Sequence, residues 1–318
     1  MKALIFTELK DGAPFKGSLE LYTLASSLEF EAYGLIIGKN ASELSDACIP
    51  GSVKVFAVKG PEILTDDILT DIVHQTAQEC GSDAVFFAAT TTGKALTPRV
   101  AARLGAGSVN DCTKVVCEDD HLVVSRPLYG GTVFENIRID SPKAVLSIRP
   151  GSYEAQEDGA ASPIEDLDIT VDSSMVKTAV KEVLHEASED VNLEEAKIIV
   201  SGGRGMGSEE NFDLIYQLAE VFDAGVGASR PVIESGWINR QHQVGQSGKI
   251  VSPDLYIACG ISGAVQHLAG MSGSKYIIAI NKDEDAPIFD IADLGIVGDV
   301  KKVLPILIES AKEFMAGR

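Results

Sequence analysis

The fold is decided by the glycine-rich turn Ser201-Gly-Gly-Arg-Gly-Met-Gly207, which directly follows the apolar run Lys197-Ile-Ile-Val200. Glycine lets a backbone approach a ligand closely, and the amides at the start of a helix can hold an anion. Similar glycine-rich or polar clusters end other short apolar runs: Gln243-Val-Gly-Gln-Ser-Gly-Lys249, Gly260-Ile-Ser-Gly-Ala-Val-Gln-His-Leu-Ala-Gly270 and Ile280-Asn-Lys-Asp283. Together they predict a site for a long, phosphate-bearing ligand of the dinucleotide kind.

The C-terminal part of the chain alternates strand-like and helix-like segments, which predicts a parallel sheet with helices on both faces. This is a Rossmann-like, doubly wound arrangement, whose ligands bind beyond the carboxyl ends of the strands. All of these clusters fall at such ends. The expected strands are 197–200, 225–228, 255–258, 276–280 and 295–298, and the expected helices are 209–222, 264–269 and 300–314.

The N-terminal part also predicts an α/β sheet, mostly parallel, with an antiparallel addition. Expected strands 122–127, 132–139 and 143–149 are joined by links too short for crossover helices, which favours antiparallel pairing. The earlier strands are 3–7, 33–37, 53–58 and 84–89, and the helices between them are 18–27, 66–78 and 94–104.

Two domains are expected in a chain of 318 residues. Residues 151–173 are rich in Gly, Ser, Ala, Asp, Glu and Pro, which is typical of a surface excursion. The acidic stretch 186–195 precedes a clear strand. We therefore expect an N-terminal domain over residues 1–188 and a ligand-binding domain over residues 189–318.

Composition restricts the partners and the compartment. The net charge is −20, which argues against nucleic acid and anionic membranes as partners, although solubility alone also explains such acidity. The N-terminus resembles a first strand rather than a signal peptide, and no run is long enough to span a membrane. The five cysteines lack metal-ligand spacing and are expected to be buried thiols. A soluble, cytoplasmic protein without a metal site is the expectation.

The first turn is not a complete dinucleotide fingerprint, because Ser208 stands where Gly-x-Gly-x-x-Gly requires its last glycine. A simple tight turn remains the alternative. After the next strand, Pro231 suits the first turn of a helix capped near Ser229 or Arg230. Arg230 is either an exposed side chain or a planar cation against an electron-rich ring or carbonyl.

The remaining motifs carry similar alternatives. The loop 243–249 offers donors to a polar ring edge or a polyol, or is a plain turn. His267 is either a core residue or a donor to the ligand. Asn281 and Asp299 contact a ribose or adenine, or act as helix caps. We find no nucleophile–base pair, so the sequence favours a site that tunes a cofactor rather than one that hydrolyses a substrate.

These motifs resemble the alpha subunit of electron-transfer flavoprotein (the ETF alpha / FixB family). The resemblance covers the whole chain. It is most specific in Ser-Gly-Gly-Arg-Gly, Val-Gly-Ala-Ser-Arg, Gln-Val-Gly-Gln-Ser-Gly-Lys, Gly-Ile-Ser-Gly-Ala-Val-Gln-His-Leu-Ala-Gly-Met and Ala-Pro-Ile-Phe…Gly-Ile-Val-Gly-Asp, which occur in the family's order.

The resemblance implies FAD in the C-terminal domain and a beta subunit in contact with the N-terminal domain. It implies that Arg230 lies against the isoalloxazine, Ser247 faces N5 and His267 lies near the pyrimidine carbonyl edge, so that these three tune the flavin. The implied FAD contacts are Arg204, Ser229, Arg230, Val244, Gly245, Gln246, Ser247, Ser262, Gly263, Ala264, Val265, Gln266, His267, Asn281, Asp299 and Val300.

The family carries single electrons from flavin dehydrogenases, such as acyl-CoA dehydrogenases, to a quinone oxidoreductase, and the chain is thus expected to be a carrier rather than an enzyme with its own substrate. The physical reading agrees, because a cation aimed at the ring favours the negative charge added on reduction. Ser247 replaces the threonine of many members, and the segment 236–242 resembles versions from anaerobes. Some of those bifurcate electrons, using NADH and ferredoxin or flavodoxin, and hold a second FAD on the beta subunit where others hold AMP. An NAD-dependent enzyme and a pure scaffold remain the alternatives of another class.

Overall fold

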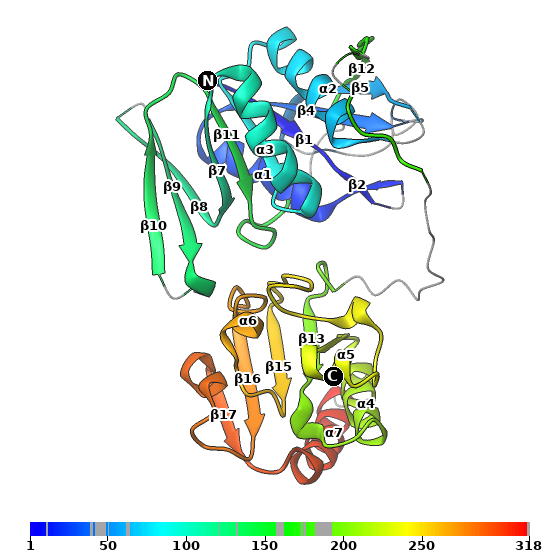
Figure 1. Cartoon of the computed structure of the whole chain (residues 1–318). Helices are drawn as coiled ribbons and strands as arrows, with labels where there is room; N and C mark the ends of the chain where they lie inside the picture. The colour runs from blue at the N-terminus through cyan, green and yellow to red at the C-terminus, as the bar shows by residue number, and fades with distance from the viewer. Residues whose placement is uncertain are drawn as a thin grey trace. The chain divides into compact units, whose positions relative to one another are not determined.

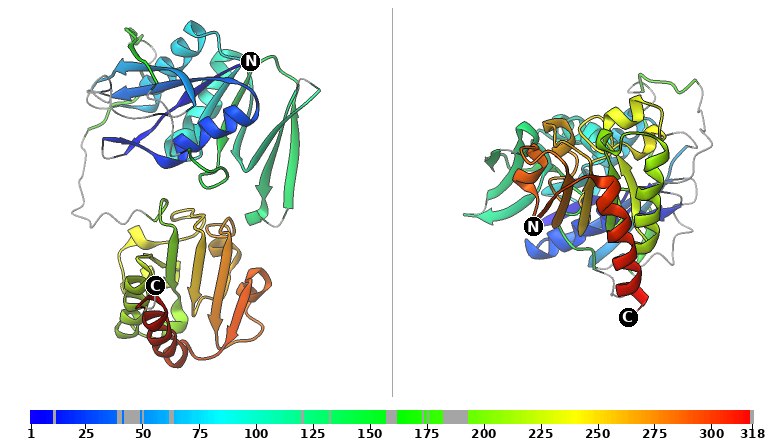
Figure 2. Two further views of the ribbon diagram at one scale, coloured as in Figure 1. Left: turned by 180° about the vertical axis from the view of Figure 1, so that it is seen from behind. Right: turned by 90° about the horizontal axis from the view of Figure 1, so that it is seen from below.

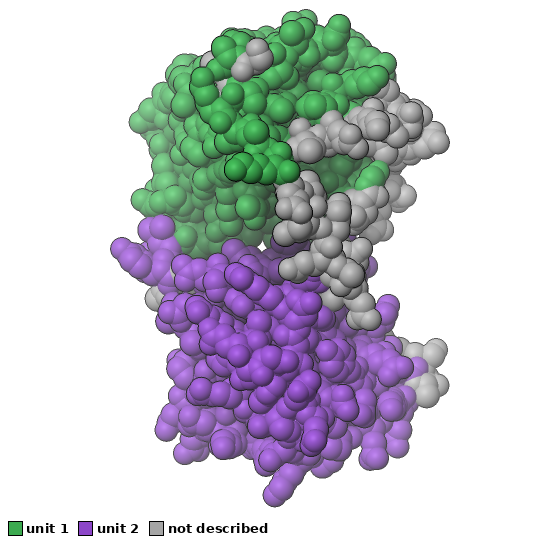
Figure 3. Space-filling view, turned by 45° about the vertical axis from the view of Figure 1, so that its right-hand side comes forward, with its two compact units in different colours: residues 1–127, 134–185 green, residues 128–133, 186–318 purple. Residues whose placement is uncertain are grey.

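The computed structural model of the chain forms two compact units (Figure 3). Unit 1 comprises residues 1–127 and 134–185, and unit 2 comprises residues 128–133 and 186–318. The boundary expected near residue 188 lies outside the described residues. The structure describes residues 1–10, 12–38, 41, 49, 51–61, 64–119, 121–131, 133–156, 162–172, 174, 176–181 and 193–316.

Unit 1 is built on a seven-stranded sheet in the order β12-β5-β4-β1-β6-β11-β7 (Figure 1). Two of its inner strands, β6 and β11, are buried at every residue, as expected for parallel strands covered on both faces. The strands are β1 (Lys2–Phe6), β4 (Glu31–Gly38), β5 (Ser52–Lys59), β6 (Ala84–Ala88), β7 (Gly107–Cys112), β11 (Ala144–Ile148) and β12 (Ile164–Asp166).

Three helices cover this sheet because its residues alternate between two apolar faces. Helix α1 packs on the face of Ala3 and Ile5, and α2 and α3 pack on the face of Leu4 and Phe6. The helices are α1 (Lys16–Ser27), α2 (Asp66–Glu79) and α3 (Thr91–Leu104), and a small hairpin joins β2 (Leu9–Lys10) and β3 (Ala13–Pro14).

The prediction for residues 143–149 was wrong in its pairing. The strand exists as β11, but it pairs in parallel with both β6 and β7 in the main sheet. A short link does not fix pairing, because this strand leaves its sequence neighbour and joins distant strands. The antiparallel addition is a separate sheet of β8 (Lys114–Glu118), β9 (His121–Leu128) and β10 (Val133–Ile139); the sequence analysis missed β7 and β8, and residue 132 lies outside the described residues.

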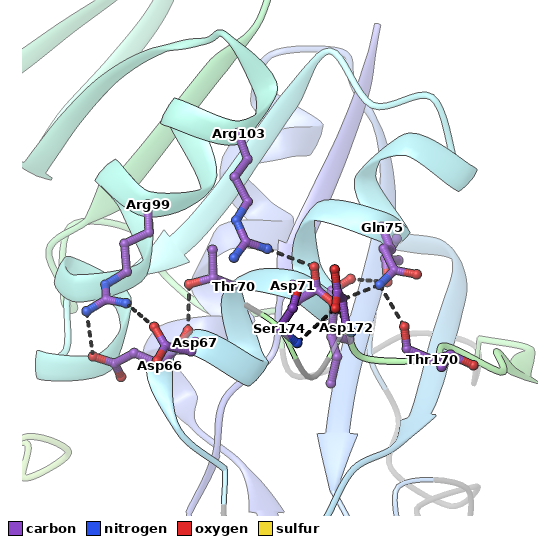
Figure 4. A network of polar contacts seen from close by, with 12 residues as sticks. Asp66, Asp67, Thr70, Asp71, Gln75, Arg99, Arg103, Thr170, Asp172 and Ser174 are labelled. Carbon is purple, nitrogen blue, oxygen red and sulfur yellow. Dashed lines mark hydrogen bonds and ion pairs between the residues drawn. The ribbon is translucent and has the colours of Figure 1, made fainter. Parts of the chain in front are cut away.

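The end of unit 1 is tied to α2 by a polar network (Figure 4). Arg99 and Arg103 on α3 reach Asp67 and Asp71 on α2, each at 2.8 Å. Asp67 also accepts hydrogen bonds from the backbone of residues 177 and 178. The surface excursion contains a short edge strand, β12, and its end also contacts α2, because Gln75 donates to Thr170 O and the Asp172 amide donates to Asp71.

Unit 2 is a five-stranded sheet in the order β14-β13-β15-β16-β17, and all its paired strands are parallel. Helices α4 and α7 pack on one face, which Figure 2 shows beside the sheet. The strands are β13 (Ile198–Gly202), β14 (Gly225–Ala228), β15 (Leu255–Cys259), β16 (Tyr276–Asn281) and β17 (Leu294–Val297), and the helices are α4 (Asp213–Phe222), α5 (Arg230–Glu234), α6 (Val265–Leu268) and α7 (Val300–Ala316).

The Rossmann-like expectation is confirmed, with two differences in the helices. The segment expected as helix 209–222 starts with a 3-10 turn, and α4 itself begins at Asp213. The opposite face of the sheet is covered mainly by loops and by α6, which is one turn long. In the part of the chain that the structure describes, no helix has the length and apolarity needed to cross a bilayer.

The thiol prediction holds in part. Cys80, Cys112 and Cys259 are free and buried, but Cys117 is exposed because it lies on the partly open three-stranded sheet. Cys48 lies outside the described residues.

Candidate functional site

The candidate site is the carboxyl edge of the unit 2 sheet, at the point where the strand order reverses between β13 and β15. From β13 the chain passes to β14 on one side, whereas β15 leads to β16 on the other. Such switch points open a crevice for a ligand in doubly wound sheets. The loops after all five strands meet at this edge because the strands are parallel.

Two glycine turns pack directly against each other at this switch point. The amide of Gly203 donates to Cys259 O at 2.8 Å, and that of Gly205 donates to Gly260 O at 2.9 Å. A Cβ on Gly203 would lie 2.2 Å from Gly260 O. The tight-turn interpretation therefore explains these glycines, and the exposed Arg204 between them is the group that the turn presents to solvent.

The loop 243–249 links two neighbouring parts of the edge. The Val244 amide donates to Ala228 O at the end of β14, and the Gln246 amide donates to Gln266 O. Beneath the loop, the buried Gln243 donates from Nε2 to Ser247 Oγ at 2.9 Å. The loop is thus braced from within, while Gln246 and Ser247 are exposed.

Helix α5 starts at the same edge. Ser229 is its N-cap residue and is buried, and Pro231 lies in the first turn. The Arg230 side chain is 67 % exposed and donates from Nε to Glu234 Oε1 at 2.7 Å. An exposed ion pair of this kind contributes little to stability, so the guanidinium can exchange this partner for another.

The turn after β15 presents an exposed strip at Ser262, Ala264, Val265 and Gln266. Gly263 has φ of +85°, and a Cβ there would lie 2.3 Å from Ile288 N, so only glycine fits. Since α6 is a single turn, the helix N-terminus expected here is short, and the loop amides are the other backbone donors at this turn.

His267 closes this turn and faces inward. Its side chain is buried, and Nε2 lies 3.0 Å from the Tyr256 hydroxyl. Nδ1 is buried and makes no hydrogen bond with the described residues. Burial lowers the pKa of His267 to about 4, against a smaller opposing influence of the Val244 backbone. The ring is therefore neutral near pH 7.

The last three predicted positions brace the edge. Asn281 donates from Nδ2 to Ile261 O at 2.9 Å and accepts from the Asp283 amide. Asp299 accepts from the Lys301 amide at 3.0 Å, which confirms the helix-cap alternative for α7. Val300 is buried in the core. Asn281 is not a helix cap; it connects the loops after β15 and β16.

The sequence analysis missed the buried polar residues below the edge. Tyr256 in the middle of Leu255-Tyr-Ile-Ala-Cys259 contacts His267, and Ser201 is fully buried nearby on the same sheet face. The signal available was a tyrosine inside an otherwise apolar strand. In the described ranges no group of three His, Cys, Asp or Glu side chains is arranged to hold a metal ion. The edge therefore offers exposed hydroxyl, amide and guanidinium groups and backbone amides.

Comparison with known proteins identifies the family of this chain. The family described as "Electron transfer flavoprotein FAD-binding domain" matches residues 192–272, and "Electron transfer flavoprotein domain" matches residues 3–172. Protein FixB of Clostridium saccharobutylicum is 42% identical, covering 98% of this chain and 96% of that protein. Electron transfer flavoprotein subunit alpha of Bacillus subtilis is 39% identical with 98% of both covered, and that of Megasphaera elsdenii is 39% identical with 91% and 89% covered. The chain belongs to the electron transfer flavoprotein alpha subunit / FixB family and carries its FAD-binding domain.

Proposed function

We propose that the chain is the FAD-binding alpha subunit of a heterodimeric electron carrier. The observation that carries the proposal is the convergence of the predicted contact loops at the switch point of a sheet inside the matched FAD-binding domain. FAD supplies the redox chemistry when it is bound, and the chain supplies position and electrostatics. This division of roles agrees with the sequence, in which we find no motif for a nucleophile–base pair.

The donor set at the edge fits FAD. Glycine turns leave backbone exposed to a pyrophosphate, and the exposed hydroxyls and amides suit a ribityl chain and a ring edge. Arg230 is the cation whose present partner is exposed and weak. We infer that the following residues hold FAD: Arg204, Ser229, Arg230, Val244, Gly245, Gln246, Ser247, Ser262, Gly263, Ala264, Val265, Gln266, His267, Asn281, Asp299 and Val300.

Ten of these residues fall into three groups by what the structure shows of them. Arg204, Arg230, Gln246, Ser247, Ser262 and Gln266 are exposed and would touch the ligand directly. Asn281, Asp299 and Val300 brace the loops that carry such contacts. His267 faces inward and would act near the pyrimidine edge as a neutral ring, because burial keeps its pKa at about 4.

The proposed partners follow from membership of the alpha-subunit family. We propose a beta subunit in contact with the N-terminal domain, holding AMP or a second FAD. Single electrons would come from flavin dehydrogenases, such as acyl-CoA dehydrogenases, and pass to a quinone oxidoreductase. A bifurcating complex that uses NADH and ferredoxin or flavodoxin is the variant of this function that a second flavin would indicate.

The deciding experiment is co-expression of this chain with a beta subunit of the electron transfer flavoprotein family. We expect a yellow heterodimer that is reduced by an acyl-CoA dehydrogenase with its substrate. One flavin per heterodimer supports simple transfer, and two support bifurcation. A colourless heterodimer, or tight binding of NADH without any flavin, would reject the proposal.

A further inference from the structure

Tyr256 lies beneath the candidate site and is the largest polar side chain buried there. It is fully buried on β15, in register with Ile199 on β13 and Ile277 on β16, so its side chain lies on the loop-covered face of the sheet. Its hydroxyl extends to Nε2 of His267, 3.0 Å away. A buried tyrosine hydroxyl requires a hydrogen-bond partner, and this imidazole supplies it.

The direction of this hydrogen bond follows from the surroundings of the other ring nitrogen, Nδ1 of His267. The Val244 amide already donates to Ala228 O, so the Val244 backbone can offer the His267 ring only its carbonyl, an acceptor. That backbone favours a proton on the ring, and Nδ1 is buried without a well-formed hydrogen bond to the described residues, while Nε2 already contacts the Tyr256 hydroxyl. A neutral imidazole carries one N–H. With that hydrogen on Nδ1, Nε2 is the acceptor and the Tyr256 hydroxyl is the donor.

No second acceptor competes strongly for the tyrosine proton. Ser201 is fully buried on the same face and partly offsets the effect of burial on the pKa of Tyr256, as a hydroxyl that donates toward the phenolic oxygen does, although its Oγ makes no well-formed hydrogen bond within the described ranges. Burial raises the pKa of Tyr256 far above neutrality, so the hydroxyl keeps its proton. Removal of this donor would leave a buried nitrogen unsatisfied and release the ring.

We propose that Tyr256 is a positioning residue for His267: its hydroxyl donates to Nε2, fixes the Nδ1–H tautomer and holds the ring against the loop 243–249. The contact to the flavin rests on the proposed function, whereas the hydroxyl–imidazole pair does not. Tyr256 would then act on FAD through His267 and not by touching it. Such an outer contact fixes the orientation of the inner group, as hydrogen bonds do behind metal-bound histidines.

The test uses the full chain in its complex with the beta subunit, with ¹⁵N-labelled histidine imidazoles. The His267 signals are assigned by their loss in His267→Gln. We expect wild-type His267 to show one neutral tautomer with the proton on Nδ1. In Tyr256→Phe the Nε2 signal should move toward that of a free acceptor nitrogen. The pKa of His267 should also rise above about 4, because the lost bond stabilised the neutral ring.

Two results would overturn the proposal. The first is a proton on Nε2 in the wild-type protein, a measurement that needs no variant to fold. The second is a His267 spectrum unchanged by Tyr256→Phe. The matched control is Tyr22→Phe, since Tyr22 is also buried and its hydroxyl lies 2.7 Å from Thr7 Oγ1 in unit 1. That variant should lose similar stability and leave the His267 signals unmoved.

The flavin gives an independent readout. We expect Tyr256→Phe to retain FAD and to change its absorption spectrum, and Tyr22→Phe to leave the spectrum unchanged. An identical spectrum in Tyr256→Phe would reject the action on FAD. If the tautomer result holds while no FAD binds at all, the proposed function fails and the Tyr256–His267 pair stands.

Discussion

The two units share one architectural feature, but the polar groups at that feature have different partners in each unit. Each has a parallel sheet whose loops gather at a carboxyl edge. In unit 1 the polar groups at that edge satisfy one another: Thr90 donates to Glu8 at 2.7 Å, and Arg149 forms a two-point contact with Asp111 at 2.6 and 3.1 Å. In unit 2, Arg204 and Ser262 are exposed at the edge, between glycine turns.

This difference shows that a carboxyl edge becomes a ligand site only where its donors remain available. Charges that pair internally stabilise the fold and leave nothing to recognise a ligand. Close packing of Gly203 and Gly205 on Gly260 lets unit 2 form its edge without large side chains. Changes at the edge of unit 1 should therefore alter stability, and changes in exposed groups of unit 2 should alter flavin binding or potential.

The largest effect is expected from Gly203→Ala. Its Cβ would lie 2.2 Å from Gly260 O, a backbone atom that cannot move without shifting β15. We expect a loss of about 4 kcal/mol or more in the free energy of unfolding, together with loss of FAD. Urea unfolding and flavin content measure both.

The control for this variant is Gly38→Ala at the end of β4, where the nearest atom to a new Cβ would be Leu9 Cδ1 at 3.7 Å. It should change stability by less than about 1 kcal/mol. Equal effects of the two substitutions would show that turn packing is not what requires glycine at position 203.

A second effect concerns pH and has opposite signs in the two units. Burial raises the pKa of Glu20 to about 7, partly offset by the Gly151 amide, which donates to it at 2.7 Å. Its contribution to stability is therefore full below about pH 4.5 and is lost as the pH rises through about 7. His267, with its pKa lowered to about 4, contributes fully above about pH 6.5, and this is lost as the pH falls through about 4.

Glu20→Gln should remove the loss of stability that occurs as the pH rises through about 7. Glutamine keeps the acceptor for Gly151 and cannot ionise, so the variant should gain about 3 kcal/mol over wild type between pH 5 and pH 8. Urea unfolding across this range, monitored separately for each unit by hydrogen exchange, measures the slope. Glu79→Gln on the exposed end of α2 is the control and should run parallel to wild type. If the free energy of unfolding of Glu20→Gln changed with pH as steeply as that of wild type, the raised pKa of Glu20 would be contradicted.

The sequence predicted those features of the two units that depend on a few neighbouring residues. Apolar runs located most strands of both sheets, and the ends of those in unit 2 located the edge, because burial and glycine turns act over a few residues. Pairing of β11 with β6 and β7 depends on distant strands, so residues 143–149 were assigned the wrong neighbours. The contact of Tyr256 with His267 was missed for the same reason: it forms only when α6 folds back over the sheet.

An intermediate effect is expected from Asp111→Asn at the edge of unit 1. Burial would raise the pKa of Asp111, but Arg149 outweighs this and lowers it, so the pair is ionised in the folded protein. Asparagine keeps the shape and tolerates the left-handed backbone, with φ of 62°. Loss of the charge should cost about 1–2 kcal/mol and leave the flavin content unchanged. The counterpart, Arg204→Gln in unit 2, should weaken FAD binding and keep the free energy of unfolding within about 0.5 kcal/mol of wild type. Loss of FAD in Asp111→Asn, or loss of stability without loss of FAD in Arg204→Gln, would contradict the distinction between the two edges.

The smallest effect on stability, and the most informative for function, is expected from Arg230→Ala. Its ion pair with Glu234 is exposed, so the free energy of unfolding should change by less than about 0.5 kcal/mol. FAD should stay bound, but its first reduction potential should fall, because the cation that favours added negative charge is gone. A tenfold change in the one-electron equilibrium corresponds to about 59 mV, which a spectroelectrochemical titration resolves. Glu234→Ala breaks the same ion pair while keeping the guanidinium, so it should leave the potential equal or higher; an equal fall in both variants would mean that the ion pair, not Arg230 at the ring, sets the potential.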